Sequence, residues 1–355
     1  MGNKLSMDEQ LLPDLLRLRG SVVAASDEFF AAKENLIKPT TPVFVPETYD
    51  AKGQVYDGWE TRRKRGPGGT MPDPTARDWV IVRLGAAGLV RSIVVDTAHF
   101  TGNYPQACSV DACSASGYSA PEELTAEADS GRWREIVPRG LLTGDARHSF
   151  GVSSARRFTH VRLNIFPDGG VARLHVHGEV VPDPALLEGL TVDLAALENG
   201  ADIVARSDQF YSSPRNLISP GLSRVMGEGW ETRRRRRPGY EWLVVRLAGR
   251  SVIRLAEIDT SWFRGNQPES ASLQILDAPG SAAAVSLADE KAWRDLLPRV
   301  RLLPDTPHRF RVEGEPATHI RLNIFPDGGV ARLRLHGSLT DDGLAAVRRR
   351  WDETA

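Results

Sequence analysis

The sequence predicts an all-β protein made of two tandem jelly-roll β-sandwich domains with a few short helices. Two observations predict this fold: an internal repeat covers most of the chain, and short strand-like runs dominate each copy. The 355 residues are enough for two domains that each bury a core. The hydrophobic fraction of 41% and the charged fraction of 26% are ordinary for globular proteins, which excludes wholesale disorder.

The internal repeat consists of strings that return in the same order. The twenty residues THVRLNIFPDGGVARLHVHG, which begin at Thr159, return at Thr318 with 17 identities. DGWETRR, DTAHFTGNYP and WREIVPR return as EGWETRR, DTSWFRGNQP and WRDLLPR. The period far exceeds that of solenoid repeats, so each copy is expected to be a complete domain. The offset between matching strings falls from 181 to 159 along the chain, so the first copy has the longer loops.

The repeat and the local composition divide the chain into five parts. We expect an N-terminal segment at 1–19, a first jelly roll at 20–182, a linker at 183–199, a second jelly roll at 200–340 and a C-terminal helix or tail at 341–355. The linker spaces its Leu and Ala residues as a helix does. Helices are also expected at the N-terminus and around DDGLAAVRRRW.

Strand signals dominate within each copy. DWVIVRL, RSIVVDT, SLQILDA and FTHVRLNIF are short β-branched or alternating runs bounded by Gly, Pro and Asp. In THVRLNIF, Val161, Leu163 and Ile165 share one face, and the residues between them share the other. A strand with one apolar face is typical of an antiparallel sheet.

Charge and cysteine content exclude several classes of protein. The formal net charge of -1 provides no overall field for nucleic acid or an anionic membrane. No apolar run approaches the roughly 18 residues of a membrane span. The two cysteines, Cys108 and Cys113, make no disulfide framework and indicate a cytoplasmic protein. The arginine run 233–237 is interpreted as a solvated or partner-facing loop.

NIFPDGGVARL is the most specific string in the chain. Pro167, Asp168 and the two glycines that follow suit a tight turn between strands. An alternative is that Asn164, Asp168 and Arg173 supply an amide, a carboxylate and a guanidinium to a binding site. The equivalents in the second copy are Asn323, Asp327 and Arg332.

GWETRR places Glu60 and Arg62 on one face of an extended segment and Arg63 on the other. Such a pair is either a surface ion pair or a site in which Arg62 binds a substrate carboxylate while Glu60 transfers protons. Glu231 and Arg233 repeat the pattern.

DTAHFTGNYP follows a strand that we expect to be buried. Histidine is the side chain that titrates nearest neutrality, which makes His99 a candidate for proton transfer; the alternative is an ordinary histidine in a loop at the end of a strand. Asn103 recurs as Asn266, whereas Trp262 replaces His99. If His99 has a chemical role, the two copies are not equivalent.

No cofactor is predicted. His175 and His177 stand two apart on one strand face, but the second copy has Arg334 at the first of these positions, which argues against a shared metal site. A divalent metal is left open without a clear ligand motif.

The strings DGWETRR, DTAHFTGNYP, WREIVPR and LNIFPDGGVARL, with their second copies, together resemble the allantoicase (allantoate amidinohydrolase) family. The resemblance spans roughly residues 20–340. It implies two jelly rolls of the galactose-binding-like type, hydrolysis of allantoate to ureidoglycolate and urea in purine (allantoin) degradation, and a homo-oligomer.

The chemistry of that substrate suggests the roles of the candidate residues. Allantoate carries a carboxylate and two ureido groups, so its site needs a cation, amide-like partners and an acid/base pair. We expect Glu60, His99 and Asp168 to transfer protons. We expect the substrate to be bound by Arg62, Asn103, Asn164 and Arg173. The competing hypothesis is a non-catalytic galactose-binding-like protein that holds a small ligand or carbohydrate.

Overall fold

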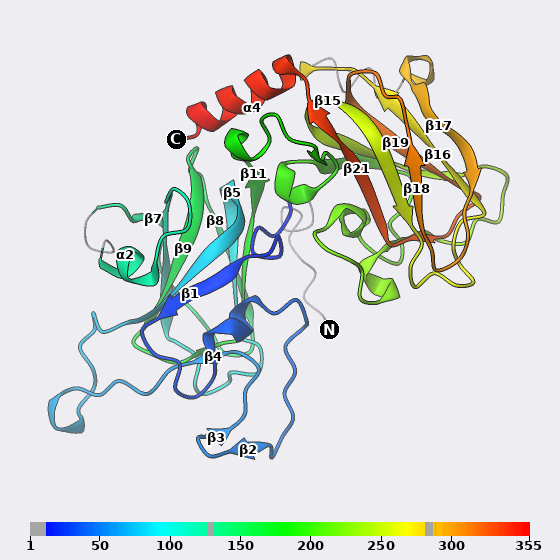
Figure 1. Ribbon diagram of the computed structural model, residues 1–355. Coiled ribbons are helices and arrows are strands. Elements are labelled where there is room, and N and C mark those ends of the chain that lie inside the picture. The colour runs from blue at the N-terminus through cyan, green and yellow to red at the C-terminus, as the bar shows by residue number, and fades with distance from the viewer. Residues whose placement is uncertain (1–11, 127–130, 281–286, 288) are drawn as a thin grey trace. The chain divides into compact units, whose positions relative to one another are not determined.

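The computed structural model describes residues 12–126, 131–280, 287 and 289–355, and these form two compact units (Figure 1). The first unit contains the described residues up to Val180 together with Thr354 and Ala355, and the second contains those from Val181 to Glu353. Each is mostly β-sheet, and the predicted fold of two tandem jelly-roll sandwiches is confirmed.

The first unit is built on a seven-stranded antiparallel sheet whose main path runs β1-β5-β9-β6-β7, with β8 and β11 paired to β5. Its strands are β1 (Ser21–Ala25), β5 (Asp78–Asp96), β6 (Ala107–Cys113), β7 (Arg134–Leu141), β8 (Arg147–Gly151), β9 (Arg157–Phe166) and β11 (Arg173–Val180). Four short strands lie at its loops: β2 (Tyr49–Asp50), β3 (Gly53–Gln54), β4 (Trp59–Glu60) and β10 (Gly170–Val171).

The long strand β5 takes part in both layers of the first sandwich. Its first half pairs with β1 and β9, and its second half pairs with β8 and β11. The register with β9 shifts between Arg83 and Gly88. One strand therefore joins the two layers without a loop.

The core follows the alternation expected from the sequence. Val161, Leu163 and Ile165 of β9 are fully buried. The other face of β9 is covered as well, since the guanidinium of Arg162 lies 4.9 Å from the ring centre of Trp133. The polar residues on that face are therefore structural components of the sheet.

The second unit repeats this arrangement. Its main path runs β12-β21-β15-β19-β16-β17, with β13 and β18 paired to β15. The strands are β12 (Val192–Asp193), β13 (Asp202–Arg206), β14 (Trp230–Glu231), β15 (Glu241–Asp259), β16 (Ser270–Leu276), β17 (Arg294–Arg301), β18 (Pro307–Arg311), β19 (Ala317–Phe325), β20 (Gly329–Val330) and β21 (Arg332–Leu339). The α-helices of the described residues are α2 (Pro121–Ala126) and α4 (Asp341–Glu353).

The stretch 183–199 differs from the helix expected there. It contains two single 3-10 turns, Pro184–Leu186 and Leu197–Asn199, with β12 between them. β12 pairs with β21, and Leu194 is fully buried. The Leu and Ala spacing that resembles a helix thus reflects contacts with the core of the second unit.

The N-terminal stretch also packs on its own unit. Of the helix expected in 1–19, residues 1–11 lie outside the described part of the chain, and the remainder forms turns. Leu15 and Leu18 are buried, and Asp14 forms a bridge with His177 of β11. At the other end of the chain, the expected C-terminal helix is α4. Among the described residues, no helix is long and apolar enough to span a membrane.

Replacing Gly170 with alanine is expected to lower the melting temperature, because the added Cβ would overlap the ring of Phe100. Overpacking of this kind costs about 1–3 kcal/mol. Thermal unfolding followed by calorimetry measures the loss. Gly151→Ala is the control, since its Cβ meets nothing within 4 Å. Equal melting temperatures for the two variants would contradict the packing argument.

Candidate active site

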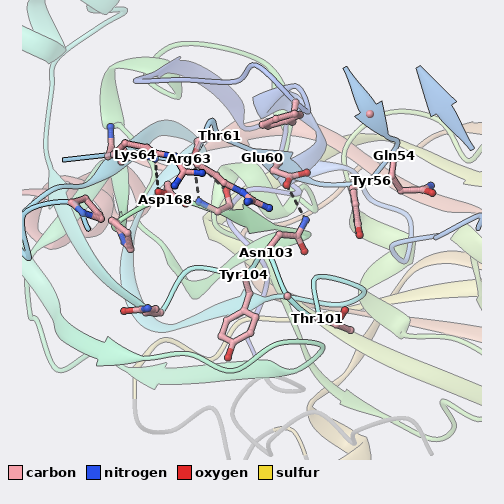
Figure 2. Close-up of a pocket in the computed structure, with 18 of the residues that line it drawn as sticks. Gln54, Tyr56, Glu60, Thr61, Arg63, Lys64, Thr101, Asn103, Tyr104 and Asp168 are labelled. Atoms are coloured by element: carbon pink, nitrogen blue, oxygen red, sulfur yellow. Dashed lines mark hydrogen bonds between the residues drawn. The ribbon is translucent and has the colours of Figure 1, made fainter. Parts of the chain in front are cut away.

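The first unit contains a pocket of about 750 Å³ at its loops (Figure 2). Four stretches of chain supply most of its lining, namely residues 52–56, 60–65, 101–104 and 167–169. The volume lies within the range of about 300–1,000 Å³ that is typical of small-molecule sites.

Three of these stretches hold one another through backbone hydrogen bonds. We call residues 58–64, 101–104 and 167–171 the three-loop junction. Within it, β4 pairs antiparallel with β10, which sets Glu60 opposite Gly170. The junction thus joins residues that are more than one hundred positions apart in the sequence.

Gly169 is the point at which the three loops meet. Its N–H donates to Thr61 Oγ1 at 3.1 Å, and its carbonyl accepts from the N–H of Thr61 at 3.1 Å. Its φ of 134° and the carbonyl of Asn103, 2.7 Å from where a Cβ would stand, leave room only for glycine. The N–H of Gly170 then donates to that same carbonyl at 2.8 Å.

The junction positions two carboxyl groups at the pocket. Glu60 Oε1 accepts a hydrogen bond from Asn103 Nδ2 at 2.8 Å. Asp168 Oδ2 accepts one from the backbone N–H of Lys64 at 2.7 Å. Both bonds are drawn in Figure 2.

Burial raises the pKa of both carboxyl groups. For Glu60, desolvation outweighs the hydrogen bond from Asn103 and the attraction of Arg63. For Asp168, desolvation raises the pKa, the hydrogen bond from Lys64 lowers it, and the nearby Asp78 carboxylate raises it further. A raised pKa suits a carboxyl group for proton transfer near neutral pH.

Cationic side chains line the same pocket. The charge of Arg63 acts on both carboxyl groups and lowers the pKa of each, although burial outweighs this effect. No carboxylate of the described residues lies within ion-pair distance of its guanidinium. Lys64 differs, because its Nζ lies 2.9 Å from Oδ1 of the buried Asp78. Arg65 also lines the pocket, so two guanidinium groups are available to an anionic ligand, and of these Arg63 is the one beside both carboxyl groups.

Three of the predicted site residues line the pocket together: Glu60, Asn103 and Asp168. Arg62 does not. Its Nη2 lies 2.6 Å from Asp27 Oδ2, and its side chain is 67% exposed. The side chain of Arg63, expected to point away from Glu60, lines the pocket instead, because this segment is irregular rather than extended.

Arg173 lies outside the lining and is fully buried. Its guanidinium donates to Thr40 O at 3.0 Å, Asp57 O at 2.7 Å and Asp57 Oδ2 at 2.6 Å. Desolvation raises the pKa of Asp57, but the hydrogen bond from Arg173 and those from its other neighbours outweigh it, so the pKa is lowered. The guanidinium is thus committed to the protein's own chain.

Asn164 and His99 also lie outside the pocket lining. Asn164 is buried in the sheet, where its Nδ2 donates to Asp111 Oδ2 at 2.8 Å and to Ser109 Oγ at 3.2 Å. His99 Nε2 lies 3.2 Å from the carbonyl of Pro42. The sequence does not reveal these directions, because each residue stands only two or three positions from one that lines the pocket, His99 from Thr101 and Asn164 from Pro167.

The second unit contains an equivalent junction. Glu231 Oε1 accepts from Asn266 Nδ2 at 2.7 Å, and Asp327 Oδ2 accepts from the N–H of Arg235 at 2.6 Å. The remaining equivalents repeat the contacts of the first unit that lie outside the pocket. Asn323 donates to Ser272 and Gln274, Arg233 lies 3.7 Å from Asp208, and Arg332 donates to the carbonyls of Gly221 and Glu228.

Other patterns noted in the sequence have local partners. His175 Nδ1 lies 2.9 Å from Asp14 Oδ2, and among the described residues no group of three or more His, Cys, Asp or Glu side chains is arranged to hold a metal. In the arginine run, Arg235 pairs with Glu241 at 2.5 Å. His175 in the histidine pair and Arg235 in the arginine run therefore each have a partner within the protein itself.

Arg63 and the hairpin residues Lys52, Gln54 and Tyr56 line the pocket, although no sequence motif predicts them as site residues. The sequence feature that points to the hairpin is a difference in length between the two copies. Between the matching strings NLI and GWE, the first copy has twenty residues and the second has ten. The longer stretch contains the hairpin β2–β3, and its residues Lys52, Gly53, Gln54 and Tyr56 line the pocket.

The fold and the site define a tandem jelly-roll protein whose first repeat holds a small-molecule pocket with acidic, amide and guanidinium groups. The family model described as the allantoicase repeat matches residues 14–181 and 192–340. The chain therefore belongs to the allantoicase family.

Individual relatives resemble the chain over nearly its whole length. A probable allantoicase of Streptomyces coelicolor is 52% identical over 95% of this chain and 88% of the relative, and one of Nocardia farcinica is 50% identical over 92% and 94%. The crystal structure of the allantoicase of Saccharomyces cerevisiae matches with a TM-score of 0.72 at 35% identity, covering 92% of each chain.

Replacing Glu60 with glutamine is expected to change how stability depends on pH. Because the native pKa of Glu60 is raised, the wild type loses stability as pH rises from the ordinary glutamate value of about 4.3 through the native pKa. The Glu60→Gln variant has no carboxyl group at this position to ionise, so it does not lose stability in this way. Its melting temperature should rise relative to the wild type across this window, as measured by thermal unfolding at several pH values. A difference that does not change with pH would contradict the raised pKa.

Proposed function

We propose that the pocket of the first unit is the active site at which this protein hydrolyses allantoate to ureidoglycolate and urea in purine degradation. The observation that carries the proposal is the convergence of Glu60, Asp168, Asn103 and Arg63 on one pocket. Family membership over the whole chain supports the substrate.

Each group of the substrate has a suitable partner in the pocket. The planar guanidinium of Arg63 can bind the carboxylate through two parallel hydrogen bonds. Asn103 donates its Nδ2 hydrogen to Glu60, which leaves its carbonyl oxygen to accept from a ureido N–H. Arg63 takes the role that the sequence suggested for Arg62 or Arg173.

The reaction replaces a C–N bond at the central carbon with a C–O bond to water. A base removes a proton from the attacking water, and an acid delivers a proton to the departing ureido nitrogen, which leaves as urea. Glu60 and Asp168 provide two carboxyl groups whose raised pKa values suit these roles. A pair of this kind typically contributes factors of about 10²–10⁴ per group.

A non-catalytic carbohydrate-binding role is not favoured. Allantoicases match this chain along nearly all of its length, and the pocket offers carboxyl, amide and guanidinium groups for an anionic ureido acid. The cytoplasmic location and the homo-oligomeric state are further proposals. The thiols of Cys108 and Cys113 are buried and are not joined in a disulfide, which is consistent with the first of these.

Glu60→Gln is expected to reduce kcat by about 10²–10⁴-fold, because it removes proton transfer while keeping an oxygen that accepts from Asn103. Release of urea from allantoate measures the rate. The matched control is Glu231→Gln, which alters the same junction in the second unit and should keep near wild-type turnover. Equal losses in both variants would contradict assignment of the site to the first unit.

Arg63→Ala is expected to raise KM by about 10–100-fold, the equivalent of one lost charge-assisted hydrogen-bonding group. Arg62→Ala is the neighbouring control, since Arg62 is exposed and pairs with Asp27. Steady-state kinetics with allantoate separates the two. If Arg62→Ala has the larger KM, the substrate carboxylate binds elsewhere than proposed.

A further inference from the structure

One wall of the pocket has no counterpart of equal length in the second unit. Residues 38–57, here called the wall segment, correspond to only ten residues, 219–228, in the second unit. The wall segment includes the hairpin β2–β3, and its residues Lys52, Gln54 and Tyr56 line the pocket. Figure 2 shows Gln54 and Tyr56 on the side of the pocket beyond Glu60.

Arg173 fastens both ends of the wall segment. Near the start, its Nε donates to Thr40 O at 3.0 Å, and at the end its Nη1 and Nη2 donate to the carbonyl and the carboxylate of Asp57. Asp57 Oδ2 also accepts from the N–H of Val43 at 3.2 Å. One buried guanidinium therefore closes a loop of about twenty residues.

His99 fastens the wall segment between its ends. Its Nε2 lies 3.2 Å from the carbonyl of Pro42, and its ring stacks on Phe44 at 5.9 Å. Phe44 in turn packs against Tyr56 at 5.2 Å, and Tyr56 lines the pocket. A continuous series of contacts thus connects His99 to the pocket without His99 entering it.

The second unit shows what this position requires. A carbonyl oxygen only accepts hydrogen bonds, so the His99 nitrogen facing Pro42 carries the hydrogen. At the equivalent position, Trp262 Nε1 donates to the carbonyl of Ser223 at 2.9 Å. Both residues hold φ near +70°, with the N–H bonded to an aspartate at 2.8 Å. The two positions share an aromatic ring that donates an N–H hydrogen bond to a carbonyl. Because Trp262 makes this contact and tryptophan does not exchange protons near neutral pH, the contact does not depend on proton transfer.

We propose that His99 and Arg173 are positioning residues, which act on the reaction by holding the wall segment so that Lys52, Gln54 and Tyr56 enclose the substrate. This inference rests on the proposed function. The wall segment has only two-residue strands of its own, so its order depends on these anchors. An anchored wall reduces the ordering cost of binding, and its loss should weaken substrate binding more than it slows the chemical step.

Substitutions of His99 distinguish positioning from proton transfer. His99→Trp copies the second unit, and His99→Gln keeps a donor in a smaller side chain. Neither substituted side chain exchanges protons near neutral pH. We expect at least one of them to keep kcat within about threefold of wild type with an unchanged pH profile, and His99→Ala to raise KM about tenfold. Losses of about 10³-fold in kcat for all three folded variants would overturn the proposal.

Arg173→Lys tests the second anchor. A lysine cannot reproduce the planar set of donors that reaches both Thr40 and Asp57, so KM should rise by about tenfold with a smaller change in kcat. Arg332→Lys makes the same change in the second unit and should leave KM unchanged. Equal KM values for the wild type and folded Arg173→Lys would overturn the role of Arg173.

Limited proteolysis tests the anchoring without reference to activity. Trypsin cleavage after Lys52 should be about tenfold faster in His99→Ala than in wild type, because cleavage follows the population of the released segment. Trp262→Ala should leave this rate unchanged. Equal rates in His99→Ala and wild type would overturn the inference, whereas a wild type that releases no urea from allantoate would overturn only the proposed function.

Discussion

The backbone hydrogen bonding of Gly169 is the constraint on which the rest of the site depends. Its N–H and its carbonyl both bond to Thr61, which holds together two loops that are far apart in the sequence. Buried backbone groups without partners cost about 1–3 kcal/mol each, so the loops have one favourable arrangement. In that arrangement, Glu60 and Asp168 both reach one pocket.

The duplication helps to separate residues that maintain the fold from residues that distinguish the pocket. The junction hydrogen bonds recur in the second unit, where Thr232 bonds Gly328 and Asn266 bonds Glu231. The near-identity of NIFPDGGVARL in both copies therefore has a structural explanation, since the turn and the close approach of the backbone at its glycine are the same in both units. The wall segment occurs at full length in the first copy alone, and it contributes Gln54 and Tyr56 to the pocket.

Local pairing of charges determines which cations remain for a ligand. The chain as a whole is almost neutral, with 45 basic and 46 acidic residues. Arg62, Lys64 and Arg173 each have a carboxylate partner of their own. Arg63 is positioned differently, beside two carboxyl groups whose burial disfavours their charged forms. An anion that enters the pocket therefore meets a guanidinium that is not already neutralised by an ion pair.

The sequence by itself determined the duplication, the all-β class, and three residues of the pocket: Glu60, Asn103 and Asp168. These follow from repeated strings, strand alternation and turn chemistry, all of which are local properties of the chain. Only the tertiary structure decided that Arg63 rather than Arg62 lines the pocket, and that His99 and Arg173 hold the wall segment. In irregular loops, the direction of a side chain depends on contacts with distant segments rather than on a repeating backbone geometry. No spacing rule along the chain can therefore distinguish adjacent positions there.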